Sequence, residues 1–298
     1  MKRTVALGLK LVFSAGLIAT LLFLADPQSV WAQVTHASWQ WVFLAGSCLL
    51  AVTGLMAWRW RYVARELGLE LSFWRATREY LISNLVNQTL PGGVVGDAAR
   101  AVRVRDAATL KTAVWSVAIE RLLGQIALVA VMTTGFAVSL TLPGGIAWPV
   151  WAWILVAIPF GIAILARRME WPPMTQIRFF LRNPMQILLS LTIFALLVTA
   201  FWASSRAVGA NLPLESLFTL IPLILSAMLV PLSIGGWGWR EGAAAALFPL
   251  AGLEMSAGIA AGVVYGALLL LTAFPAVVLL LLPKSLKPHA AGESELAT

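Results

Sequence analysis

Long apolar runs separated by short polar connections form the dominant pattern along this chain. A helix needs about 20 apolar residues to cross a bilayer. The runs therefore predict about six spanning helices, at 7–25, 40–58, 112–140, 148–166, 184–203 and 256–282. The composition agrees, because the chain is 60% hydrophobic and 11% charged, whereas ordinary soluble domains carry about 25% charged residues. We expect an all-α polytopic membrane protein in which residues 1–298 form a single integral membrane domain.

The first apolar run allows a second interpretation. Lys2 and Arg3 precede it and Ala32 follows it, an arrangement that is also typical of a cleaved signal peptide. We expect an uncleaved first helix, because cleavage would remove the symmetry between the two halves of the chain that is described below.

The positive charges are distributed unevenly among the connections. The net charge is +8, and Lys and Arg gather in four connections, at 59–78, 100–111, 167–182 and 284–287. The intervening connections 26–39 and 141–147 hold no Lys or Arg. Because cytoplasmic loops retain Lys and Arg, this asymmetry predicts that both termini lie in the cytoplasm. The charges lie beside apolar spans, so we expect no nucleic-acid partner.

Two similar segments interrupt the apolar pattern. One runs from Pro91 to Arg100 and the other from Pro231 to Glu241, and each contains clustered glycines and charges of both signs. The residues that we expect to break the helices are Pro91, Gly92, Gly93 and Gly96 in the first segment and Pro231, Gly235, Gly236 and Gly238 in the second. Matching Gly/Pro interruptions in two halves of a membrane protein indicate a binding site formed by broken helices.

The connection charges place the two segments on opposite sides of the membrane. Each is predicted to form a re-entrant helical hairpin, the first over about 71–105 and the second over about 214–250. The first repeat is then 1–143, the second, inverted repeat is 144–285, and 286–298 is a cytoplasmic tail. Irregular backbone at membrane depth must be buried in protein or line a watery cavity, so we expect a polar cavity between the hairpins. The alternative is an irregular bundle with ordinary helices at 71–90, 214–230 and 236–250.

Glu120 and Arg121 are the most informative charges, because they stand inside a predicted span. A charge at the bilayer centre costs about 2.5–3.5 kcal/mol on insertion scales, so such residues are usually paired and functional. Adjacent helical residues do not face each other, so each needs another partner. The broken segments offer two further sets of opposite charges, Asp97 with Arg100 and Arg240 with Glu241. We hypothesise one network of these six residues around the cavity; alternatively, Glu120 and Arg121 snorkel to the cytoplasmic surface.

Polar residues beside the first break extend this predicted substrate-binding site. Asn84 and Asn87 are three residues apart, so they share one helical face. Asp97 has the position and chemistry of a helix N-cap. Arg100 follows on the same short helix, where its guanidinium could form paired hydrogen bonds with a phosphate.

The residues that hold metals or form common catalytic motifs are scarce. Cys48 is the single cysteine, and His36 and His289 are the only histidines. We therefore expect no metal, no cofactor and no catalytic residue, and we interpret the protein as a non-enzyme. The sequence does not indicate an oligomeric state.

The residues of both breaks and the intervening span resemble one known family. It is the flippase-like integral membrane family that includes the transmembrane region of lysylphosphatidylglycerol synthase. The resemblance rests on three ordered blocks, Leu90 to Arg100, Glu120-Arg121 and Pro231 to Glu241. One departure is Val95, where many family members have glycine.

The resemblance implies a flippase or scramblase of the bacterial or archaeal inner membrane. Its partners would be phospholipids or polyprenyl-phosphate-linked lipids, and a lipid-synthesising enzyme is a further expected partner. We expect that the chain does not aminoacylate lipids by itself. Two alternatives stay open: a membrane-embedded enzyme of lipid or polyprenyl-phosphate metabolism, and a secondary transporter of a small anion.

Overall fold

The computed structural model describes residues 26–90, 93–141, 172–229 and 234–281, together with Ile146, Trp148 and Ile154. Within these residues the chain is helical and forms no strand. The α-helices are α2 (Pro27–Thr35), α3 (Trp39–Glu66), α4 (Phe73–Thr89), α5 (Val95–Arg103), α6 (Leu110–Thr141), α8 (Pro172–Arg182), α9 (Pro184–Ala207), α10 (Leu220–Ala227), α11 (Trp239–Leu247), α12 (Met255–Ala273) and α13 (Pro275–Leu281). Short 3₁₀ helices are η1 (Arg105–Ala107), η3 (Leu214–Leu217) and η4 (Phe248–Ala251).

Four helical stretches in the described part of the chain are long and apolar enough to cross a membrane. They are α3, α6, α9 and the continuous stretch of α12 and α13. These confirm the predicted spans at 40–58, 112–140, 184–203 and 256–282. The predicted spans 7–25 and 148–166 lie outside the described residues, except for Ile154 in the second. The helix α3 is longer than its predicted span and continues to Glu66.

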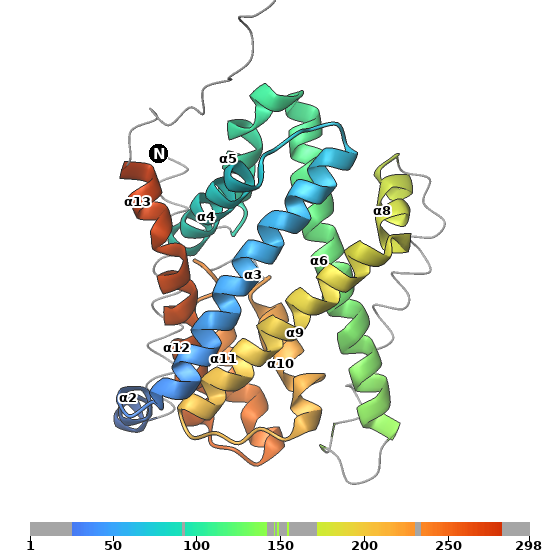
Figure 1. The fold of residues 1–298 in the computed structure, drawn as a ribbon. Helices are drawn as coiled ribbons and strands as arrows, with labels where there is room; N and C mark the ends of the chain where they lie inside the picture. The colour runs from blue at the N-terminus through green and yellow to red at the C-terminus, as the bar shows by residue number, and fades with distance from the viewer. Residues whose placement is uncertain are drawn as a thin grey trace, which may run out of the picture.

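The helices α3 and α9 pack against each other and lie close together near α2, and α12 packs against both (Figure 1). Their contact is apolar and contains many small residues, such as Ala45 in α3 and Ala200 in α9, which are fully buried. Small side chains allow helix backbones to approach closely where the surrounding lipid offers no hydrophobic drive for association. The packing of these three helices forms the main core, against which both broken segments lie.

Each broken segment forms two helices. In the first, α4 packs against α5; in the second, α10 packs against α11. Figure 1 shows α4 and α5 toward one end of α3 and α10 and α11 toward its other end. The turn of the first segment includes Gly93 with a φ of 62°, and that of the second includes Gly235, Gly236 and Gly238 with φ of 56°, 80° and 88°. These left-handed conformations explain why both turns are rich in glycine. Pro91, Gly92 and Pro231 lie outside the described residues.

The two broken segments touch each other. A Cβ added at Gly235 would lie 3.1 Å from the Cα and the carbonyl oxygen of Gln88, near the end of α4. Only glycine combines the positive φ of this position with so close an approach to another backbone. The second break is therefore packed against the last turn of the helix that leads into the first break.

Candidate functional site

Glu120 lies at the centre of a buried ion-pair cluster beside the first break. Its Oε1 accepts a hydrogen bond from Arg59 Nη2 at 2.7 Å, and its Oε2 accepts one from Arg100 Nη2 at 2.9 Å. The side chains of Glu120 and Arg100 are fully buried and that of Arg59 is 2% exposed. The carboxylate thus joins α6, which carries it, to α3 and to the short helix α5.

Asp97 extends this cluster on the other side of Arg100. Its carboxylate lies 3.0 Å from Arg100 Nε and 2.6 Å from Arg121 Nη2. It also accepts hydrogen bonds of 3.2 Å from Ser83 Oγ and Asn87 Nδ2. Four groups thus hold this carboxylate in place, namely two guanidinium groups, one hydroxyl and one amide. We call Arg59, Asp97, Arg100, Glu120 and Arg121 the first cluster.

Close packing of α5 on α4 makes the Asp97 contacts possible. A Cβ at Gly96 would overlap the carbonyl oxygen of Ser83, so only glycine fits between the two helices. The Gly96 N–H donates a 2.7 Å hydrogen bond to Asn87 Oδ1. Asn87 therefore binds the backbone of the break with its oxygen and Asp97 with its nitrogen.

The Arg100 guanidinium is held between two aromatic rings. Its Cζ lies 4.5 Å from the centroid of the Trp60 ring and 4.5 Å from that of Tyr80. The Trp60 indole in turn donates a 3.1 Å hydrogen bond to Ser116 Oγ. An arginine held by rings on two sides and carboxylates on its edges is a fixed charge rather than a mobile one, since cation–π and ionic contacts both restrain it.

The first cluster carries one positive charge in excess. Three guanidinium groups face two carboxylates, and all five residues contact a partner of opposite charge. Arg100 Nη1, Arg59 Nε and Arg121 Nε have no hydrogen-bond acceptor among the described residues. The Arg121 side chain is 37% exposed and is the most accessible member of the cluster. The arrangement can accept one further anionic oxygen group, and Arg121 is where that group would arrive.

A second cluster forms at the other break. Arg240 and Glu241 pair with each other, and Glu241 Oε2 accepts a 2.6 Å hydrogen bond from the Gly238 N–H, which precedes α11. The Arg240 Cζ lies 5.0 Å from the Trp237 ring centroid and 5.6 Å from that of Tyr265. Both clusters therefore place a fully buried arginine between aromatic rings and next to a carboxylate.

The predicted single network is divided in the structure. Four of the six predicted charges, Asp97, Arg100, Glu120 and Arg121, are joined together, whereas Arg240 and Glu241 pair with each other. The reason is that α6 supplies partners for Asp97 and Arg100, whereas Arg240 and Glu241 pair with each other, so neither set needs charges from the other. Asn87 joins the first cluster, while Asn84 makes no side-chain hydrogen bond among the described residues.

One local expectation was wrong. Asp97 is not an N-cap, because α5 begins at Val95 and Asp97 lies inside its first turn, where it binds side chains. The charged side chains of both breaks are buried among the described residues. Asp97, Arg100, Glu120, Arg240 and Glu241 are each 5% exposed or less, because they neutralise one another and pack against rings.

The structure adds three residues that the sequence did not single out. Arg59 pairs with Glu120, and Trp60 and Tyr80 enclose Arg100. Arg59 had been counted among the cytoplasmic arginines, because it directly follows the apolar run that ends near Trp58. One feature of the sequence could have identified Arg59. The glutamate in the next span needs a cationic partner, and Arg59 is the arginine of α3 that lies nearest the apolar run.

Ion pairs outside these clusters lie at the arginine-rich end of the bundle. Arg103 pairs with Glu79, and Arg75 Nη2 lies 2.5 Å from Asp106 Oδ1. The hydrogen bond from Arg75 lowers the pKa of the Asp106 carboxyl below its ordinary value. The side chains of Arg75 and Asp106 are 36% and 66% exposed, so we interpret this as a surface pair rather than a part of the site.

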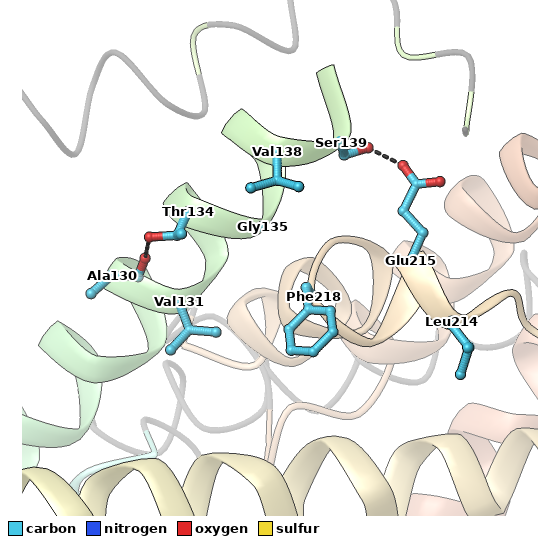
Figure 2. A pocket seen from close by; sticks show the side chains of 9 residues that line it. All are labelled: Ala130, Val131, Thr134, Gly135, Val138, Ser139, Leu214, Glu215 and Phe218. Atoms are coloured by element: carbon cyan, nitrogen blue, oxygen red, sulfur yellow. Dashed lines mark hydrogen bonds between the residues drawn. The ribbon is translucent and has the colours of Figure 1, made fainter. Parts of the chain in front are cut away.

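A largely apolar cavity of about 620 Å³ lies between α6 and the start of the second broken segment (Figure 2). Its walls include Val131, Val138 and Phe218, and Glu215 is the one charged residue among the described residues that line it. Figure 2 shows Glu215 accepting a hydrogen bond from Ser139 at the cavity edge. None of the eight predicted substrate-binding residues lines this cavity.

Comparison with known proteins identifies the family. A family model described as the lysylphosphatidylglycerol synthase transmembrane region matches residues 7–277. No curated protein matches the chain. The matched range contains both broken segments and every member of both clusters, which confirms the resemblance inferred from the three sequence blocks. The chain therefore belongs to the family of the lysylphosphatidylglycerol synthase transmembrane region, a membrane-embedded, multi-pass family with a lipid-related function.

Proposed function

We propose that this protein is a lipid translocase that moves a phosphate-bearing lipid between the leaflets of the bacterial or archaeal inner membrane. The observation that carries the proposal is the first cluster. It has a one-charge positive excess and unpartnered guanidinium donors beside a helix break, within an apolar bundle. Charges at such positions are costly, and in membrane proteins they usually mark the path of a substrate or ion.

The pattern of helix contacts supports an inverted repeat. In the first half α3 packs on α4 and α5 packs on α6; in the second half α9 packs on α10 and α11 packs on α12. Contacts between the halves also correspond, because α4 packs on α12 while α10 packs on α6. In our proposal the α4–α5 and α10–α11 pairs are the two re-entrant hairpins, which enter from opposite faces. In transporters of this architecture the substrate site lies where the repeats meet.

The closed arrangement of the charges defines one state of the proposed cycle. In this state the phosphate would first meet Arg121, which is partly exposed, while Arg100 and Arg240 remain enclosed. Relative motion of the two hairpins would then separate the buried arginines from their carboxylate partners and expose them to the head group. The contact of Gly235 with Gln88 is the place where the hairpins would slide or separate.

Exchange of an acyl-labelled phosphatidylglycerol in proteoliposomes tests the proposal. The fluorophore is on the acyl chain, so the phosphate head group stays intact, and a membrane-impermeant reductant bleaches only the outer leaflet. Wild-type protein should increase the bleached fraction, and Glu120→Gln should abolish the increase. Arg105→Gln, at an exposed arginine outside both clusters, should behave as wild type. Wild-type vesicles that bleach like protein-free vesicles would contradict the proposal. Recovery of a covalently altered lipid would indicate an enzyme instead.

A further inference from the structure

A second cavity, of about 520 Å³, lies at the arginine-poor end of the bundle, between the end of α2 and the end of α9. Figure 1 shows these two helix ends close together, far from α5. The polar residues that line it are Gln33, His36, Ser38 and Arg206. None of the eight predicted substrate-binding residues lines it, so this cavity is separate from the two charge clusters.

Arg206 supplies a fixed positive charge to this cavity. Its Cζ lies 5.8 Å from the Trp41 ring centroid and 5.2 Å from that of Trp202. The two rings meet edge to face with centroids 5.3 Å apart, so they form one aromatic support for the guanidinium. Arg206 Nη1 also donates a hydrogen bond to Asn211 Oδ1. The two rings and the amide together fix the orientation of the guanidinium, and none of them neutralises its charge.

The charge of Arg206 is not compensated by a carboxylate among the described residues. All ion pairs of the described chain involve other arginines, and Arg206 Nε is buried without a hydrogen-bond acceptor. Arg206 is also the only Lys or Arg in the connection 204–213. A positive charge that is retained on the arginine-poor side, and held by tryptophans, is well suited to binding an anion.

Exposed tryptophans place this cavity at the depth of lipid head groups. Trp31 in α2 and Trp39 at the start of α3 are 71% and 73% exposed, and they flank the cavity residues His36 and Ser38. Tryptophan is enriched at the membrane–water interface because its ring is apolar and its N–H is polar. At this depth, the phosphate of a membrane lipid is an anion that can reach Arg206.

We propose that Arg206 binds the phosphate of an anionic phospholipid in this cavity, with His36, Ser38 and Gln33 as neighbouring polar groups. The binding goes beyond the proposed translocation and does not depend on it. One further role rests on the proposed function: this cavity would bind the head group before or after its translocation on this side of the membrane.

Native mass spectrometry of the full-length protein with added phosphatidylglycerol tests this binding. Arg206→Gln should weaken retention of one lipid about tenfold or more, the effect of losing a charge-assisted hydrogen bond. Arg105→Gln, which removes an exposed arginine of the opposite end, should retain the lipid as wild type does. Diacylglycerol, which lacks the phosphate, should bind Arg206→Gln and wild type equally. Equal phosphatidylglycerol loss in the Arg206 and Arg105 variants would overturn the proposal.

Three controls separate other causes of a loss of binding. Arg206→Lys keeps the charge and should recover part of the binding. Loss of the thermal transition of Arg206→Gln would show that this variant has unfolded. In that case the lipid binding of the folded Arg206→Lys variant tests the proposal. Millimolar inorganic phosphate should compete poorly, because it lacks the acyl chains, and full competition would overturn a lipid-specific site. Glu120→Gln should still retain the lipid at Arg206, even though leaflet exchange is abolished. The binding result is therefore independent of whether the translocase proposal holds.

Discussion

Arg59 and Glu120 lie 61 positions apart and form a 2.7 Å salt bridge whose side chains are 2% and 0% exposed. The same glutamate binds Arg100, so one carboxylate of α6 connects this helix with α3 and with the short helix α5. Removal of one partner from a buried ion pair costs about 3–5 kcal/mol, because it leaves a buried charge uncompensated. Glu120 should therefore be among the residues on which the stability of this bundle depends most.

Glu120→Gln should lower the free energy of unfolding by about 3–5 kcal/mol, since two buried arginines lose their carboxylate. Thermal unfolding in detergent measures the change. Arg105→Gln is the matched control and should stay within about 0.5 kcal/mol of wild type, because its side chain is exposed. A Glu120 variant as stable as the Arg105 variant would show that the cluster does not hold the helices together.

The double variant Arg59→Gln/Glu120→Gln should be less destabilised than the sum of its two single variants. The second substitution removes the charge that the first one left unpaired, and residues in direct contact show coupling of about 0.5–3 kcal/mol. A double-mutant cycle on thermal or denaturant unfolding gives this coupling. Strict additivity would mean that the pair contributes nothing as a pair.

Gly96→Ala should destabilise the protein and reduce leaflet exchange. The added methyl group would overlap the Ser83 carbonyl oxygen and force α5 away from α4, which also moves Asp97. Overpacking of this kind typically costs about 1–3 kcal/mol. Gly54→Ala is the control, because a Cβ at Gly54 in α3 meets no atom within 4 Å. That variant should be neutral or slightly more stable, given the helix propensity of alanine.

Arg121→Gln should impair leaflet exchange more than it impairs folding. The Arg121 side chain is 37% exposed, so its loss leaves Asp97 with Arg100, Ser83 and Asn87 as remaining partners. Comparison of exchange rates and melting temperatures for Arg121→Gln and Glu120→Gln separates the two roles. Equal loss of stability in both variants would contradict an accessible, substrate-facing Arg121.

Gly266→Ala should disturb the second cluster. A Cβ at Gly266 in α12 would overlap Arg240 Nη2 and reach 3.0 Å from the Trp237 ring, so the buried guanidinium would have to leave its place. Lower thermal stability is expected, and leaflet exchange should fall with it. Gly46→Ala provides the control in α3, since its Cβ would make an ordinary 3.6 Å contact with Leu268.

Much of the membrane architecture could be predicted, because it follows from local sequence. The four described spans coincide with apolar runs, and both breaks contain the glycines whose positive φ the turns require. Local patterns also identified Asp97, Arg100, Glu120 and Arg121, since charges inside apolar segments need partners. The family match over residues 7–277 confirms the resemblance carried by the same blocks.

Pairing over long sequence distances could not be predicted. Arg59 looked like a loop arginine because the apolar run ends near Trp58, but α3 continues to Glu66 and brings Arg59 against α6. The division of the charges into two clusters could not be predicted either, because it also depends on pairing between distant segments. Opposite charges in three segments allow several pairings, and only the packing of the helices selects which carboxylate faces which guanidinium.

The count of three arginines against two carboxylates has an electrical consequence for the proposed cycle. A phosphodiester head group carries one negative charge, so its binding would make the first cluster neutral. One elementary charge moved through the full membrane potential is worth about 2.3 kcal/mol per 100 mV. The empty cluster would thus feel the voltage while the loaded one would not. Polarisation of the membrane would then act on the return of the empty protein, and the lipid-carrying step would be electrically silent.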